Sequence, residues 1–169
     1  YREPNTIHDL FCMWGTDINN IHAVGGEGTY RFHDGKQFQR RDELTSEEIS
    51  LYGVWGFGNN DVYIVGSHGT ILHFDGNEEG EWVSMESGTE EYLLGIWGSS
   101  PSNIFAVGDN ATVLHYDGNK WCSMDPKTDK YLTKVRGLGP NCVYAVGDDG
   151  LVIRFDGEKW NDMSLGEDA

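Results

Sequence analysis

Short apolar segments alternate with glycine-rich polar turns along the chain, and this pattern repeats four times. The repeats align without gaps and read MWGTDINNIHAVGGEGTYRFHDG from Met13, VWGFGNNDVYIVGSHGTILHFDG from Val54, IWGSSPSNIFAVGDNATVLHYDG from Ile96 and VRGLGPNCVYAVGDDGLVIRFDG from Val135. Their starting points are 41, 42 and 39 residues apart. A period of about 40 residues, made of short strands and tight turns, is typical of a propeller blade.

The third repeat shows the expected strands of one blade. Residues 93–97, 103–107, 112–116 and 121–124 are short apolar segments separated by turn residues. The third and fourth of these segments are joined by Asp117-Gly118, which is a strong hairpin signal. Four antiparallel strands make one propeller blade.

The second strand of each repeat is apolar at consecutive positions, as at residues 62–65, 104–107 and 143–146. A strand with one face in water would alternate apolar and polar residues. Apolar residues on both faces therefore predict that each sheet is sandwiched between neighbouring blades.

The predicted fold is an all-β propeller with four blades of four antiparallel strands, in a single domain over residues 1–169. The expected blades cover approximately residues 10–43, 50–88, 92–126 and 131–165. We expect a self-contained ring that closes by apolar packing of the fourth blade against the first, because residues 1–9 do not resemble an outer strand. An arc of a larger propeller and half of an eight-bladed dimer are the alternatives.

Two aromatic columns run through the repeats, and both favour packing over binding. The first column holds Trp14, Trp55, Trp97 and Arg136. The second holds Phe38, Trp82, Trp121 and Trp160, followed three residues later by Arg41, Met85, Met124 and Met163. An indole in the first column would cover the gap between blades while its N–H finds a carbonyl. Arg136 breaks the first column, and its cation is expected to stack on a neighbouring ring or pair with an acidic loop residue.

The recurring Trp-Gly, Ala-Val-Gly and Leu-His-Tyr-Asp-Gly motifs, with a following Trp, resemble the repeats of bacterial β-propeller proteins. The resemblance extends loosely to Kelch, tachylectin-type and sialidase-like Asp-box propellers and covers residues 10–165. The adjacent Asp and Gly depart from the Asp-box pattern, and the Gly-His and Trp-Asp marks of WD40 repeats are missing. The resemblance therefore implies a fold and no residue-by-residue function.

Charge and cysteine content restrict the partners. The chain has 12 Lys and Arg against 28 Asp and Glu, a net charge of −16. Such a surface repels nucleic acid and anionic membranes and suits proteins, glycans or cations. Cys12, Cys122 and Cys142 are too few and irregular for a disulfide framework. They leave the compartment open, with an extracellular or cell-surface location preferred.

The turns between the second and third strands are the candidate site. Four turns of equal length would bring acidic and polar side chains to the axis of a propeller: Glu27, His68, Asp109, Asp148 and Asp149. Carboxylates there could hold an amine, sugar hydroxyls or Ca2+, although Asp, Asn and Gly are also what tight turns require. Arg136 joins this candidate set as the break in the repeat. His73 and His115 share one column with Phe32 and Arg154, which indicates a tolerant strand position.

The sequence contains no recognisable catalytic set. The favoured hypothesis is a non-enzymatic binding module that recognises a protein or glycan through one face and needs no cofactor. The alternatives are a structural subunit of an oligomer, filament or larger complex and, less favoured, a hydrolase that acts on carbohydrate through acidic loop residues.

Overall fold

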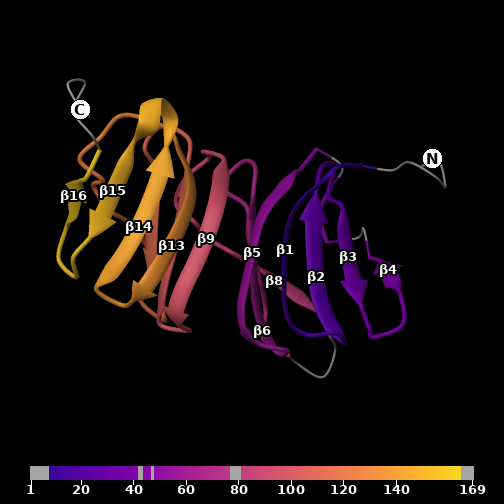
Figure 1. Cartoon of the computed structure of the whole chain (residues 1–169). Coiled ribbons are helices and arrows are strands. Elements are labelled where there is room, and N and C mark those ends of the chain that lie inside the picture. Colours follow the sequence, from indigo (N-terminus) through magenta and orange to yellow (C-terminus); the bar gives the residue numbers. More distant parts are fainter. Residues whose placement is uncertain (1–7, 42–43, 47, 77–80, 165–169) are drawn as a thin grey trace.

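The protein folds into four antiparallel sheets of four strands each, shown by a computed structural model that describes residues 8–41, 44–46, 48–76 and 81–164 (Figure 1). Blade one consists of β1 (Leu10–Asp17), β2 (Asn20–Gly25), β3 (Tyr30–His33) and β4 (Phe38–Arg40). Blade two consists of β5 (Leu51–Gly58), β6 (Asp61–Gly66), β7 (Ile71–Phe74) and β8 (Trp82–Met85). Blade three consists of β9 (Leu93–Ser100), β10 (Asn103–Gly108), β11 (Val113–Tyr116) and β12 (Trp121–Ser123). Blade four consists of β13 (Leu132–Gly139), β14 (Cys142–Gly147), β15 (Val152–Phe155) and β16 (Trp160–Asp162).

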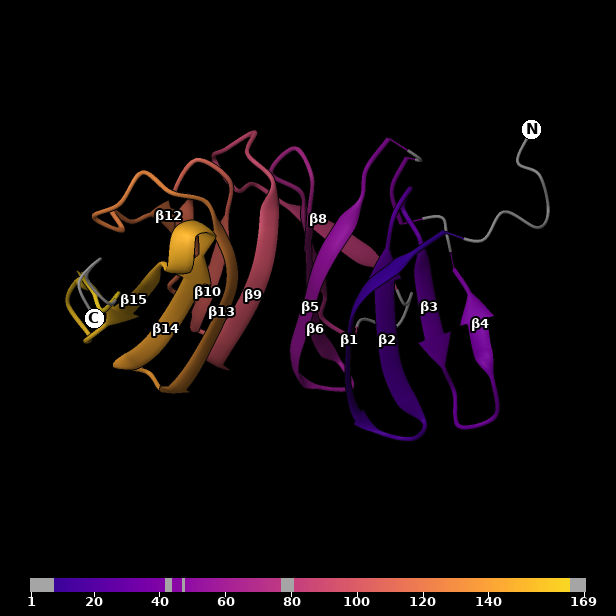
Figure 2. The same ribbon diagram turned by 45° about the horizontal axis from the view of Figure 1, so that its top comes forward.

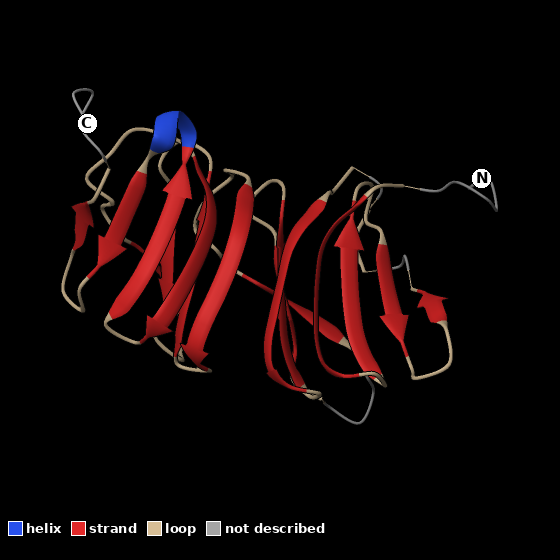
Figure 3. Cartoon of the chain, viewed as in Figure 1, coloured by secondary structure: helices blue, strands red, loops and turns tan. Residues whose placement is uncertain are grey.

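Each blade is an up-and-down meander whose strands pair in chain order. A single 3-10 turn, η1 (Asp148–Gly150), joins β14 to β15 and is the one helical segment in the described part of the chain (Figure 3). That part contains no helix with the length and apolar character needed to cross a membrane. The all-β class and the four blades of four strands are as the sequence predicts.

The sheets stack face to face, and a cluster of apolar side chains lies in each of the three spaces between them. We call these spaces junction 1/2, junction 2/3 and junction 3/4, after the blades on either side. At junction 3/4, for example, Phe105 and Val107 of blade three pack against Val135, Ile153 and Trp160 of blade four. Apolar side chains on both faces of β10 explain why its sequence does not alternate.

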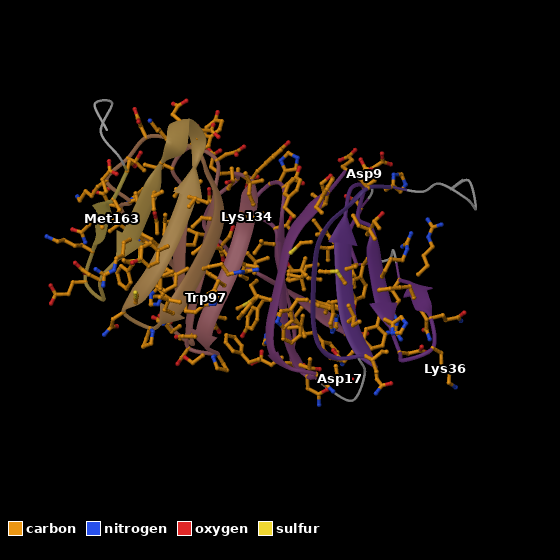
Figure 4. The ribbon with its side chains drawn as sticks, in the orientation of Figure 1. Asp9, Asp17, Lys36, Trp97, Lys134 and Met163 are labelled. Carbon is orange, nitrogen blue, oxygen red and sulfur yellow. The ribbon has the colours of Figure 1, made fainter. Side chains whose placement is uncertain are left out.

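The eight-residue strands β1, β5, β9 and β13 follow one another along the inner side of the stack. The three- and four-residue strands β4, β8, β12 and β16 form the outer edge. Asp9 and Asp17 mark the two ends of the innermost strand of blade one in Figure 4.

The blades form an open arc and not a closed ring. Blade one and blade four lie at opposite ends of the molecule in two orientations, and their outer strands point away from each other (Figures 1 and 2). The extensive contacts between blades are those of β1 with β5, β5 with β9 and β9 with β13. The favoured self-contained ring, closed by packing of blade four on blade one, is therefore not what the structure shows, and the arc that stood as its alternative is.

The open ends expose residues that the repeat buries elsewhere. Leu10 and Met13 of blade one are 53% and 61% exposed. Leu51 and Val54, at the same repeat positions in blade two, are 0% and 1% exposed because blade one covers them. Val146 on the far side of blade four is 40% exposed, whereas its counterpart Val107 is fully buried. Both ends of the arc thus present a blade face that no neighbouring blade covers.

Candidate functional site

The predicted site residues lie largely in the four turns that join the second and third strands of the blades. We call residues 25–28, 66–69, 108–111 and 147–150 the rim turns. Each rim turn places two consecutive residues in the left-handed region, as Glu27 (φ 53°) and Gly28 (φ 68°) do in blade one. Thr29 N–H donates to the Gly26 carbonyl at 3.0 Å and closes that turn. Two positive φ values are the mark of a type I′ hairpin turn, so backbone geometry accounts for much of the Gly, Asn and Asp content of the rim.

Three carboxylates gather where the rim turns of blades three and four meet. The pKa of Asp109 is raised, first because burial disfavours its charge and then because Glu91 and Asp148 repel it. Asn110 Nδ2 donates to Glu91 Oε2 at 2.8 Å, which holds this carboxylate beside the turn. The structure therefore brings two predicted residues together and adds Glu91, which lies in the connection between blades, outside the aligned blocks of the repeat.

The remaining rim residues have partners of other kinds. Lys130 Nζ lies 3.5 Å from Asp149 Oδ2, and His8 Nδ1 lies 3.4 Å from Glu27 Oε1. The ring of His68 meets the ring of Tyr92 edge-on with centroids 5.4 Å apart. Within the ranges that the structure describes, no group of three or more His, Cys, Asp or Glu side chains is arranged to hold a metal ion.

Arg136 does not belong to the rim, although the sequence grouped it with these residues. It lies in the middle of β13, and its NH1 group donates to the Ile96 carbonyl at 3.1 Å. Its guanidinium lies over the Trp55 ring, 5.1 Å from the centroid. The stacking that the sequence predicts is present, and the break in the Trp column is explained by a cation that reaches across blade three. Lys134, two residues earlier, donates to the Leu94 carbonyl at 3.2 Å in the same way, beside β9 in Figure 4.

Stacked aromatic rings line the inner strands next to the rim turns, and the sequence analysis did not find them. The rings of Phe11 and Tyr52 are stacked with centroids 5.6 Å apart, and those of Tyr52 and Tyr92 follow at 6.1 Å. Phe11 is 47% exposed and Tyr92 is 38% exposed. We call Phe11, Tyr52 and Tyr92 the aromatic ladder. Phe11 and Tyr52 share a repeat column but Tyr92 comes from a different one, so no single column of the alignment contains all three.

The ladder adjoins the acidic part of the rim. The Tyr92 carbonyl accepts a hydrogen bond from Asp109 N–H at 3.0 Å, and Glu91 directly precedes Tyr92 in the chain. At the other end, the Phe11 ring lies 3.7 Å from the point where a Cβ on Gly26 would be. One end of the ladder therefore adjoins the rim turn of blade three, and the other end adjoins the rim turn of blade one.

The Asp column that closes each repeat has a structural role. Asp34, Asp117 and Asp156 each accept two backbone N–H bonds within their own hairpin turn, as Asp156 Oδ1 does from Glu158 and Lys159 at 3.0 Å. These bonds stabilise the ionised form and lower the pKa of Asp156 to about 2. The glycine that follows each of these aspartates has a positive φ, from 90° at Gly35 to 106° at Gly157. The Asp-Gly pair is thus turn chemistry.

His73 and His115 each form a hydrogen bond with a residue at the same repeat position. His73 Nε2 lies 2.7 Å from Asp61 Oδ1, and His115 Nε2 lies 2.7 Å from Asn103 Oδ1. Asp61 and Asn103 occupy the same repeat position, at the start of the second strand of their blades. The column of His73 and His115 therefore has a specific hydrogen-bonding role where it holds histidine. Cys12, Cys122 and Cys142 are free thiols.

Comparisons with known proteins identify the architecture. No family model matches the chain, and no curated protein matches it in sequence. Among solved structures, "YCF48 bound to D1 peptide" superposes with a TM-score of 0.71 at 17% identity, over 94% of this chain and 54% of that one. YCF48 from Cyanidioschyzon merolae gives 0.70 at 14% identity, over 88% and 51% of the two chains. The WD40 repeats of RRP9 give 0.70 at 7% identity, over 91% and 52%.

The chain is a β-propeller repeat protein. It spans about half the length of the propellers that it matches, with 54%, 51% and 52% of those chains covered. At these identities the likeness establishes the fold alone.

Proposed function

We propose that this chain is a non-catalytic binding module that takes a basic, extended segment of a partner protein along the inner side of the arc. The observation that carries the proposal is the aromatic ladder, a row of three stacked rings whose last member, Tyr92, adjoins Glu91 and Asp109. Exposed aromatic residues in a row are unusual on a surface unless a partner covers them.

The chemistry of this surface suits Lys and Arg side chains. A cation over the face of a tyrosine or phenylalanine ring is attracted by the ring quadrupole, and a neighbouring carboxylate adds a charge-assisted hydrogen bond. The net charge of −16 would raise the rate of encounter with a basic segment and make binding sensitive to salt. The similar structure of YCF48 was solved with a bound D1 peptide, so a protein of this shape can take a peptide ligand. This precedent supports a peptide as the ligand that we propose.

The test is binding of a fluorescent peptide that alternates Lys or Arg with small residues, measured by anisotropy, with a glutamate version of the peptide as reference. Tyr92→Ala should weaken binding about tenfold, in line with the loss of about 1–2 kcal/mol of cation–aromatic contact. Tyr131→Ala is the matched control, because Tyr131 occupies the same position in blade four, is 45% exposed and lies outside the ladder. Equal weakening by both substitutions, or equal affinity for the acidic peptide, would contradict the proposal.

A second candidate, an assembly subunit, is favoured by the uncovered face of blade one. Leu10 and Met13 lie at positions that a preceding blade covers everywhere else in the arc. A second copy whose blade four supplied that cover would make an eight-bladed ring. Sedimentation over a hundredfold range of protein concentration tests this, and a strict monomer throughout would remove the candidate.

A further inference from the structure

A cavity of about 260 Å³ lies between blades one and two, away from the rim turns and the aromatic ladder. Aromatic and polar side chains from both blades line it: Asn20, His22, Tyr30, Phe32, Arg41, Asn59, Asn60, Phe74 and Trp82. This volume is just below the usual range for ligand sites, so the cavity fits a molecule with one ring.

The cavity exists because blade one departs from the repeat at four positions that converge there. Where blades two and three have Tyr63 and Phe105, blade one has His22. Its three other departures are Tyr30 in place of Ile71 and Val113, Phe32 in place of His73 and His115, and Arg41 in place of Met85 and Met124. The register confirms the last equivalence, because Arg41 N–H donates to the Tyr30 carbonyl as Met124 N–H donates to Val113.

Arg41 leaves open the space that methionine fills at the other junctions. Met85 packs against the apolar cluster of junction 2/3, and Met124 packs against that of junction 3/4. The Arg41 guanidinium instead lies over the Phe32 ring, 5.4 Å from its centroid. Trp82, on the blade-two wall, stays partly exposed, whereas Trp160 at the same repeat position is 1% exposed.

The cavity has an ordered and uncharged polar side. His22 Nδ1 lies 2.8 Å from the Tyr30 hydroxyl, and His22 Nε2 lies 2.9 Å from Asn20 Oδ1. Burial, and then the nearby Arg41 cation, lower the pKa of His22 to about 4, so this imidazole is neutral at pH 7. Arg41 is therefore the one charged group among the lining residues, and no ion pair of its guanidinium is present within the described ranges.

We propose that this cavity binds a small aromatic carboxylate, with the ring against Trp82 and Phe32 and the carboxylate on Arg41. The Arg41 guanidinium lies over the Phe32 ring, and the other walls of the cavity carry aromatic rings and amide groups. These groups match a ligand that combines a negative charge with a flat apolar ring. A guanidinium gives such a carboxylate two parallel hydrogen bonds, which fixes its orientation. The charge of this site is positive and that of the rim is negative, so the two surfaces would take different ligands.

The same chemistry occurs in two sources, a free aromatic acid and a peptide that ends in phenylalanine with a free carboxylate. The experiment is therefore calorimetric titration of the folded chain with 3-phenylpropionate, with acetyl-Gly-Gly-Phe and with the amidated form of that peptide. Saturable binding of 3-phenylpropionate alone identifies a free acid as the source, and binding of the free-carboxylate peptide identifies a chain terminus. Either result supports the site if the amidated peptide binds at least tenfold more weakly or not at all.

Arg41→Met is the decisive variant, since methionine stands at this position in the other three blades and should fold without strain. It should weaken the anionic ligand at least tenfold, and Arg41→Lys should retain part of the affinity. Arg40→Met is the control, with the same change of charge one residue away and outside the lining. Tyr92→Ala should leave this binding unchanged. Absence of saturable binding by every ligand, or equal loss in the Arg40 and Arg41 variants, would overturn the proposal.

Discussion

Junction 1/2 and junction 3/4 are built from the same repeat and differ in what fills them. At junction 3/4, Phe105 and Met124 of blade three meet Phe155 and Trp160 of blade four in a buried apolar cluster. At junction 1/2 the corresponding space is a cavity with His22 and Arg41 on its blade-one side. The difference shows that the same packing residues recur at most junctions of the repeat, whereas at junction 1/2 several of them are replaced together.

The histidine in blade one shows how such a change keeps local structure intact. In blades two and three the cross-strand pair is aromatic on the second strand and histidine on the third, as in Tyr63 opposite His73. Blade one reverses the pair, with His22 opposite Phe32. His22 still bonds the residue that begins its own second strand, Asn20. The exchange therefore preserves the hydrogen bond and moves the imidazole from the third strand of the blade to the second.

The largest expected effect contrasts the same aromatic column at an interior junction and at an open end. Trp160→Ala should cost about 3–5 kcal/mol of unfolding free energy, because Trp160 is 1% exposed and the substitution leaves a cavity in junction 3/4. Phe38→Ala should cost less than about 1 kcal/mol, because Phe38 is 49% exposed on the uncovered face of blade one. Urea unfolding followed by far-ultraviolet circular dichroism measures both.

Similar losses for the Trp160 and Phe38 variants would contradict the open arc. They would mean that in solution the face of blade one is covered as tightly as an interior junction.

The next effect is the loss of stability at low pH that the buried His22 causes. The pKa of His22 is about 4 in the folded chain, against an ordinary value of 6.5 for a histidine in water, so the unfolded chain binds the proton more readily. The stabilisation from neutral His22 is complete above pH 6.5 and is lost as the pH falls toward 4, by about 3 kcal/mol at 1.36 kcal/mol per unit. His22→Phe, which installs the residue found at Phe105, should remove this component. Unfolding free energies of the two proteins measured from pH 7 to pH 4.5 should therefore diverge in favour of the variant, and parallel curves would show that His22 is not held neutral.

The local features of the repeat could be predicted from sequence because they depend on neighbours in the chain. The hairpins closed by Asp117-Gly118 and its equivalents need only short-range turn chemistry, and the doubly apolar second strands need only a neighbour on each side. Closure of the ring could not be predicted in this way. It depends on a small rotation between successive blades that accumulates along the arc, and no residue pattern records that angle.

The surface features were missed for a different reason. The aromatic ladder combines Phe11 and Tyr52 with Tyr92, which lies in another repeat column, so reading columns one at a time cannot find it. The cavity left a clearer signal in the sequence, because Phe32 differs from His73 and His115 and Arg41 replaces the methionine of the other three repeats. A reading column by column lacks the register that brings these two residues to one junction. Arg136 shows that a break in a repeat column need not mark a binding site, because the structure explains this residue by its packing on Trp55.

The smallest expected effect is that of one substitution that makes junction 1/2 more like the apolar junctions 2/3 and 3/4. Arg41→Met restores the residue found at Met85 and Met124 and should add about 1 kcal/mol to the unfolding free energy, because it buries apolar atoms where a charged group now lies in the open. The gain should be smaller than the apolar area alone suggests, since His22 and Tyr30 continue to hold polar atoms in the space. Adding His22→Phe to this variant should increase the gain beyond the sum of the single substitutions, because the two side chains share one cavity. Strict additivity would mean that each residue acts on its own blade, and that the cavity is a local feature of blade one and not a property of the junction.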